Sequence, residues 1–149
     1  MDEFLENIIN YLQERVDADT FFSASKKPLV CEAHSVNHAL TASQPEIQVQ
    51  IIDAREQTNY TTFCGKRANA IPLQFSAYAG QLNKKNDAQH YSIKMADKVI
   101  KYIDELVYGE QEKYGISTAT HISSTVGLPL NDGGTIYASV VRYNFVVEI

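Results

Sequence analysis

The second half of the chain constrains the fold most, because four segments of contrasting periodicity follow one another there. Residues 71–79 alternate apolar and polar side chains, which is typical of a strand with one buried face. Residues 86–108 repeat apolar side chains at helical spacing, and residues 116–126 and 135–148 are again extended. The last two segments are joined through an Asn-Asp-Gly-Gly turn at 131–134. The predicted order is strand, helix, strand, strand.

The helix predicted over 86–108 has an apolar stripe opposite a charged face. Asn86 and Gln89 have the spacing of a capping pair, and Gly109 stands where a helix commonly ends. A second helix is predicted over residues 2–16, from apolar residues at the same period. We expect both helices to pack on one face of a sheet through six apolar residues: Leu5, Ile8, Leu12, Val99, Ile103 and Val107.

The remaining strand signals complete a sheet. Residues 47–51 alternate in polarity, and residues 29–36 have mixed polarity after a proline. In the segment 135–148 the odd-numbered side chains are apolar and aromatic, so this face should pack on the helices. Pro72 predicts that its strand lies at a sheet edge or begins there. We therefore predict a single α+β domain over 1–149, with two helices on one face of a mainly antiparallel sheet.

Composition and charge exclude several classes of protein. The chain is 44% hydrophobic and 21% charged, which is ordinary for a globular domain. Its net charge of −5 argues against a nucleic-acid-binding surface over most of the protein, because such surfaces are basic. No apolar run is long enough to span a bilayer, and the acidic N-terminus is unlike a secretion signal. These features predict folding in the cytoplasm with reduced cysteines.

A polar segment from 53 to 70 separates two of the predicted strands. Apolar periodicity is lost there, apart from Tyr60 and Phe63. Long segments of this kind in compact domains are often functional. We predict that it forms a long projecting hairpin or loop.

One local cluster has the residue types of a metal site. Cys31, His34 and His38 lie close in sequence, and Cys64 in a turn-like segment completes a two-sulfur, two-nitrogen set suited to zinc. The same residues also allow a Cys/His nucleophilic pair. However, Cys31 and His34 point to opposite faces of an extended strand. We therefore predict no metal, no cofactor and no catalytic residue. The 15 tyrosines and phenylalanines are assigned mainly to the core rather than to base stacking.

Three segments carry a resemblance to a known family: 70–79 (AIPLQFSAYA), 92–105 (SIKMADKVIKYIDE) and 137–148 (YASVVRYNFVVE). In this order they resemble the tail terminator proteins of long-tailed bacteriophages, also called tail completion or minor capsid proteins. The similarity covers residues 2–16 and 47–148, and residues 17–46 are not matched. The resemblance implies a structural virion protein without enzymatic activity.

Members of that family form a six-fold ring on the end of the tail tube. The implied partners are therefore further copies of the chain, the tail tube protein and the head-tail connector protein, and DNA would pass through without specific binding. The implied location is the virion tail, after assembly in the host cytoplasm. Candidate interface residues lie in the polar segment: Arg55, Glu56, Asn59, Tyr60, Lys66 and Arg67.

Two alternatives remain open at this stage. A small metal-binding enzyme predicts one zinc per chain, lost when His34 and His38 are replaced. A nucleic-acid-binding domain that uses aromatic side chains predicts salt-dependent retention on nucleic acid.

Overall fold

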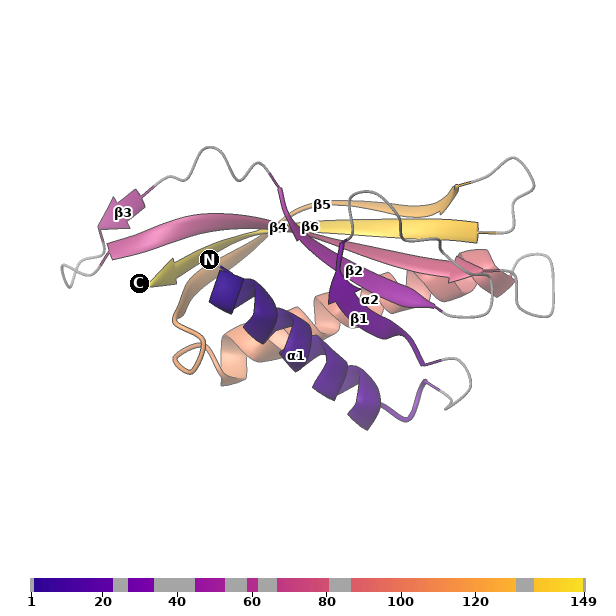
Figure 1. The fold of residues 1–149 in the computed structure, drawn as a ribbon, viewed down its shortest axis with the longest axis horizontal. Coiled ribbons are helices and arrows are strands. Elements are labelled where there is room, and N and C mark those ends of the chain that lie inside the picture. Colours follow the sequence, from indigo (N-terminus) through magenta and orange to yellow (C-terminus); the bar gives the residue numbers. More distant parts are fainter. Residues whose placement is uncertain are drawn as a thin grey trace.

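The computed structural model describes residues 2–22, 27–33, 45–52, 59–61, 67–80, 87–130 and 136–148. Within these residues, two helices pack on a six-stranded sheet (Figure 1). The helices are α1 (Asp2–Ala18) and α2 (Asp87–Gly109), and the strands are β1 (Leu29–Glu32), β2 (Glu46–Ile51), β3 (Asn59–Thr61), β4 (Arg67–Gly80), β5 (Ile116–Pro129) and β6 (Ile136–Glu148). None of the helices in these ranges is long and apolar enough to cross a membrane.

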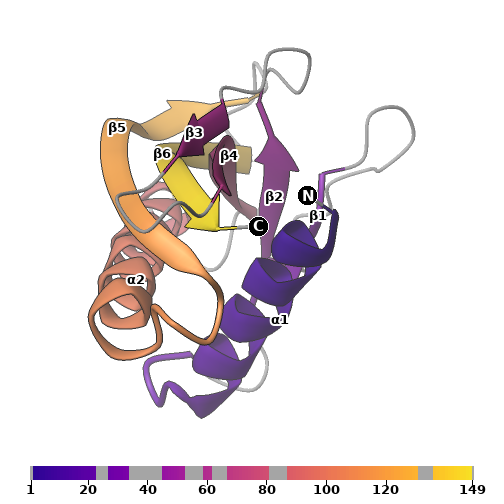
Figure 2. The ribbon, with the colours of Figure 1, turned by 90° about the vertical axis from the view of Figure 1, so that its left-hand side faces the viewer.

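The sheet has the strand order β1-β2-β4-β6-β5. Every pairing is antiparallel except that of β1 with β2, which is parallel. The short strand β3 pairs with the beginning of β4, on the side that β2 covers farther along. Figure 2 shows both helices on the same side of the sheet, with α1 next to β1 and β2, and α2 next to β5 and β6. The predicted α+β class is confirmed, and so is the placement of both helices on one face.

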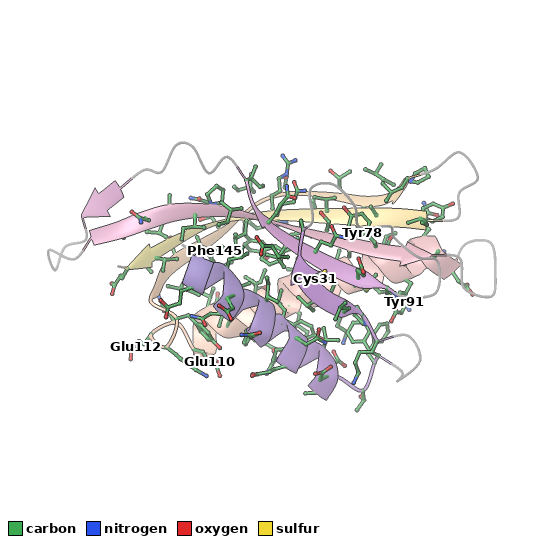
Figure 3. The ribbon with its side chains drawn as sticks, viewed as in Figure 1. Cys31, Tyr78, Tyr91, Glu110, Glu112 and Phe145 are labelled. Atoms are coloured by element: carbon green, nitrogen blue, oxygen red, sulfur yellow. The ribbon has the colours of Figure 1, made fainter. Side chains whose placement is uncertain are left out.

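The core lies between the helices and the odd-numbered face of β6, as predicted. Val141, Tyr143, Phe145 and Val147 are all buried on that face. Phe145 is fully buried and meets the Phe4 ring of α1 edge to face, with ring centroids 5.5 Å apart. Figure 3 labels Phe145 where the sheet meets α1. This ring therefore joins the first helix to the last strand, which lie at opposite ends of the sequence.

The two helices also contact each other directly. The Tyr11 hydroxyl donates a hydrogen bond to the backbone carbonyl of Tyr102, at 2.7 Å. Arg15 forms an ion pair with Glu105 nearby. Of the six apolar residues predicted to anchor the helices, Val107 is partly buried and the other five are buried.

The side-chain amide of Gln89, one of the two predicted capping residues, makes a contact across the molecule. Its Nε2 donates to the carbonyl of Gly127 at 3.0 Å, so the side chain reaches from α2 to β5. The Gly127 N–H donates to the Ser139 hydroxyl at 2.9 Å, and that hydroxyl lies 3.1 Å from the Ser92 hydroxyl. This polar network joins α2 to β5 and β6. Asn86, the other predicted capping residue, lies outside the described residues.

The prediction that Pro72 marks a sheet edge is wrong, because β4 lies between β2 and β6. Pro72 is opposite Asn144 of β6, well inside β4. Its carbonyl accepts a hydrogen bond from the Ile52 N–H at 2.9 Å, so its backbone faces the end of β2. The missing N–H of proline therefore falls opposite Ile52, where β2 ends, so it removes a possible hydrogen bond to β2 and none to β6.

The Asp19 carboxylate links the residues directly after α1 to α2. The sequence resemblance did not match this segment. Asp19 accepts hydrogen bonds from the Tyr102 hydroxyl at 2.5 Å and from the Phe21 N–H at 2.9 Å, and its carboxylate lies 2.8 Å from the Lys98 ammonium. The contact with Lys98 is the largest cause that holds the pKa of Asp19 well below its ordinary value, and the hydrogen bonds from Tyr102 and Phe21 follow. These contacts join the chain reversal after α1 to α2.

Replacing Asp19 with asparagine is expected to lower the free energy of unfolding at pH 7 by about 1–3 kcal/mol, since charged hydrogen bonds are lost. Because the folded state lowers this pKa, the stabilisation is complete above the ordinary value of 3.8 and is lost as the pH falls below it. The difference between wild type and variant should therefore shrink below about pH 4. Urea unfolding from pH 7 down to pH 2.5 measures it.

The matched control is Asp17→Asn. Asp17 is exposed and lies 3.5 Å from the Lys27 ammonium, so its loss should change stability by less than about 1 kcal/mol at any of these pH values. An Asp19→Asn effect that is equally large at pH 7 and pH 2.5 would contradict the assigned charge role.

Candidate assembly surface

Only one of the four residues weighed as metal ligands, and not predicted to bind one, lies in the described part of the chain. Cys31 is on β1 and is partly buried, and Figure 3 labels its position on that strand. Burial, followed by the nearby Glu46 carboxylate, raises the pKa of its thiol to about 11, which keeps it protonated and unreactive at neutral pH. His34, His38 and Cys64 lie outside the described residues. Among the residues that are described, no three His, Cys, Asp or Glu side chains are grouped to hold a metal.

The predicted interface segment forms a hairpin in its described part. Asn59, Tyr60 and Thr61 make up β3 and pair with the first residues of β4 in antiparallel register, with Asn59 opposite Asn69. Figure 1 shows this hairpin at one end of the sheet, beyond the helices. The predicted hairpin is therefore confirmed over 59–61 and 67–69, and the rest of 53–66 lies outside the described residues. Three of the six candidate residues, Arg55, Glu56 and Lys66, lie outside the described residues.

The projecting hairpin continues the sheet rather than leaving it. The β4 residues that pair with β3 also pair with the end of β6, and Ala68 lies opposite Glu148. The end of β6 is in turn paired with the start of β5, where Ile116 lies opposite Val147. At this end the sheet is a strip with β3 on one edge and β5 on the other. In the described residues, β3 pairs only with β4 and β5 only with β6.

Strand β5 and the residue after it carry four of the seven exposed large apolar side chains of the described chain. The strand is 14 residues long, and these four side chains are 45 to 58% exposed. No Asp, Glu, Lys or Arg occurs from 116 to 130. The four exposed side chains are Ile122, Val126, Leu128 and Leu130. Most proteins protect an edge strand with charged residues, so an uncharged edge of this length indicates a contact surface.

The pairing of β5 with its neighbour is irregular. Its register against β6 shifts in three places, between Ile116 and Thr118, between His121 and Ser123, and between Thr125 and Leu128. Gly127, with φ of 66°, lies in the last of these irregular stretches. Figure 2 shows the resulting curve of β5 around the sheet. Ile122, Val126 and Leu128 lie within or beside these irregular stretches and are exposed to solvent.

The sequence interpretation did not single out β5 as a surface. It predicted a strand over 116–126, whereas β5 runs to Pro129 and forms one edge of the sheet. The signal was present as the absence of Asp, Glu, Lys and Arg over 116–130, a segment rich in serine and threonine. That signal has a meaning only once β5 is known to be an edge strand.

The assignment of the aromatic side chains to the core holds for most of those described. Phe4, Tyr11, Phe22, Phe75, Tyr102, Tyr143 and Phe145 are buried. Phe21 is partly exposed, but the ammonium groups of Lys94 and Lys98 lie 5.6 and 5.0 Å from its ring centroid. The Phe22 ring meets it edge to face at 5.1 Å, and the Tyr91 ring, labelled in Figure 3, stacks on it at 6.4 Å between centroids. Neighbouring side chains therefore occupy this ring, and it is not an open stacking platform.

Comparison with known proteins adds no assignment. No model of a protein family matches this chain, and no curated protein matches it either. The functional interpretation therefore depends on the fold, the two sheet edges and the sequence pattern.

Proposed function

We propose that this chain caps the tail tube of a long-tailed bacteriophage as a six-membered ring of identical copies. In this role it ends polymerisation of the tube and provides the surface to which the head-tail connector protein attaches. The proposal assigns the chain a structural role in the virion, without catalysis and without a cofactor. The observation that carries it is a sheet with two unlike edges within the described residues. β5 forms one edge, and β1, whose Val30 N–H donates to Gln13 of α1, and β3 form the other.

Unlike edges suit a closed ring. When one surface of a subunit contacts a different surface of the next, copies add head to tail, and the series closes if the rotation between copies allows it. A dimer with two-fold symmetry instead buries the same surface on both copies. A sheet with different edges therefore has the asymmetry that a ring of identical subunits requires.

The projecting hairpin supplies a second contact. Its strand β3 lies beyond the helices, so it can reach a neighbouring molecule without disturbing the core (Figure 1). The polar segment 53–70 also has charged residues suited to setting the register of the contact with the tail tube or a neighbouring copy. The candidates are Arg55, Glu56, Lys66 and Arg67. The net charge of −5 suits passage of DNA through the ring, because an acidic lining repels phosphate rather than binding it.

Deleting residues 56–67 tests the proposal. The deletion removes β3 and leaves the described core residues, from Ala68 onward, in place. We expect the free energy of unfolding to stay within about 1 kcal/mol of wild type. We also expect the deleted form not to assemble on tail tubes, so that tails grow beyond their normal length and lack heads. Electron microscopy of tails made with each form measures length and head attachment.

A variant in which 56–67 is replaced by a Gly-Ser segment of equal length controls for the shortened connection. It should fail in the same way if the hairpin residues themselves make the contact. If the deleted form gave tails of normal length joined to heads, the hairpin would not be needed for assembly and would no longer be part of the proposal. Wild-type protein that is absent from the head-proximal end of the tail would overturn the proposed function itself.

A further inference from the structure

The two strands at the β1 and β3 edge differ in how much of their backbone is already in use. On β1, the outward-facing Val30 N–H donates to Gln13 Oε1 of α1 at 2.8 Å, so α1 covers this strand. β3 continues the same edge beyond the helices (Figure 1), and within the described residues it pairs only with β4. β3 is therefore the part of this edge that can accept a further strand.

The opposite edge is open along the middle of β5. Gln111 donates to the Ser117 carbonyl at 2.8 Å, and Gln89 donates to the Gly127 carbonyl at 3.0 Å. Between these two positions, no side chain of the described residues binds the backbone of β5. Unpaired N–H and C=O groups along an edge strand are a template for another strand.

The irregular register of β5 limits the length of a strand that can be added to it. β5 pairs regularly with β6 over Thr118–His121 and over Ser123–Thr125, with register shifts before, between and after these stretches. A bulge displaces backbone groups that an added strand would use, so each regular stretch accepts a strand of three or four residues. β3, with three residues, has this length.

The directions of the strands also agree with such a contact. β3 is antiparallel to β4, β4 to β6 and β6 to β5, so β3 and β5 run in opposite directions within one copy. Neighbouring copies in a ring are related by a rotation about one axis. If the sheet passes round that axis, each strand keeps its direction, so β3 of one copy meets β5 of the next in antiparallel orientation.

The level of β3 along the sheet selects one of the two regular stretches. Tyr60 is in register with Ala68 of β4, which pairs with Glu148 at the end of β6. The adjacent Val147 pairs with Ile116, so β3 and the start of β5 lie at the same end of the sheet. Thr118–His121 is the regular stretch nearer to this end, and the remaining stagger is of the kind needed when a sheet closes on itself.

Neither strand contains a charged residue of the kinds that protect sheet edges. Residues 59–61 are Asn, Tyr and Thr, and no Asp, Glu, Lys or Arg occurs from 116 to 130. Pairing of these two segments therefore desolvates no such charge. The charged residues of the polar segment stand before and after β3 in the sequence and lie outside a contact of three residues.

We propose that in the ring β3 of one copy adds, antiparallel, to Thr118–His121 of β5 in the next copy. The sheet then continues from copy to copy, and the projecting hairpin is the element that joins them. This inference rests on the proposed function, and it adds the surfaces through which identical copies meet. Strand addition of this kind takes affinity from main-chain hydrogen bonds and specificity from the side chains at the contact.

The alternation of faces along a strand sets the register of this contact. Through β4, Tyr60 is in register with Glu148, while Thr120 is in register with Asn144 of the same strand. Positions 144 and 148 are an even number of residues apart, so positions 60 and 120 belong to one face of the sheet. The alignment that keeps this face and stays inside the regular stretch places Asn59–Thr61 opposite Ala119–His121, with Tyr60 opposite Thr120.

Cross-linking of paired cysteines tests the contact. The background variant carries Cys31→Ser and Cys64→Ser, so that only introduced thiols react. Tyr60→Cys and Thr120→Cys are then combined, because the proposed register places them side by side on neighbouring copies. Protein bound to tails is treated with a short bis-maleimide and separated by size under denaturing conditions.

The matched control combines Tyr60→Cys with Thr125→Cys. Thr125 is exposed, as Thr120 is, and it is in register with Val140 on the same face, but it lies about 16 Å farther along β5. We expect the Thr120 pair to give a ladder of oligomers up to the ring size, at least about ten times faster than the Thr125 pair. Each single-cysteine variant should stay monomeric.

The possible outcomes separate the contact from the function. Equal or faster linking through Thr125 would overturn the inference, and so would dimers from Thr120→Cys alone, which would show that β5 meets β5. Rings seen at tail ends by electron microscopy, without a ladder from the Thr120 pair, would overturn the contact while leaving the tail function intact. Tail ends without rings would overturn the proposed function, and the contact with it.

A second pair covers the case in which replacing Tyr60 disturbs the hairpin. Asn59→Cys with His121→Cys joins the next position of the same register and should give the same ladder. Rings in which neither pair links would contradict the β3–β5 contact.

Discussion

Replacing Phe145 with alanine is expected to lower the free energy of unfolding by about 3–5 kcal/mol. The ring is 0% exposed and lies between α1 and the sheet. It contacts Phe4 at 5.5 Å, Tyr143 at 5.9 Å and Phe75 at 6.5 Å between ring centroids, so its removal leaves three aromatic partners around a cavity. Urea unfolding followed by circular dichroism measures the change.

Tyr108→Ala is the matched control for this experiment. It also removes an aromatic ring, but Tyr108 is 91% exposed, so stability should change by less than about 0.5 kcal/mol. If Phe145→Ala destabilised the protein no more than Tyr108→Ala, the ring would not be the centre of the core.

Ile103→Ala is expected to lower the free energy of unfolding by about 2–5 kcal/mol. Ile103 is 1% exposed, on the face of α2 that packs against the sheet. Ile103→Val removes a single methylene and should cost only about 0.5–1.5 kcal/mol. The ratio between the two variants tests burial directly, since an exposed position would show little difference between them. Equal stability of Ile103→Ala and wild type would remove this part of α2 from the core.

The helices could be predicted from local pattern because a buried helix must repeat apolar residues at its own period. The helix predicted over 86–108 is observed at Asp87–Gly109, and that predicted over 2–16 at Asp2–Ala18. The face of β6 that packs on the helices was also predicted, because successive side chains of a strand alternate between its two faces.

Pairing partners could not be predicted in the same way. Pro72 appeared to mark a sheet edge. Its backbone instead faces the end of β2, which is more than 20 residues earlier in the chain. β1 lies parallel to β2, a pairing that no local pattern within residues 17–46 indicates. Gln89 reaches Gly127 across the molecule, a contact that no local pattern indicates. Each of these outcomes depends on contacts between distant parts of the chain.

The sequence by itself therefore determined the class of fold, the main elements and which face of each is buried, because hydrophobic periodicity is a local property. Only the tertiary structure decided which strands lie at the edges of the sheet. The uncharged segment 116–130 became a candidate contact surface only when β5 was found to pair on one side within the described residues. An edge exists because of the order of strands in space, and that order results from long-range pairing, which side-chain periodicity does not encode.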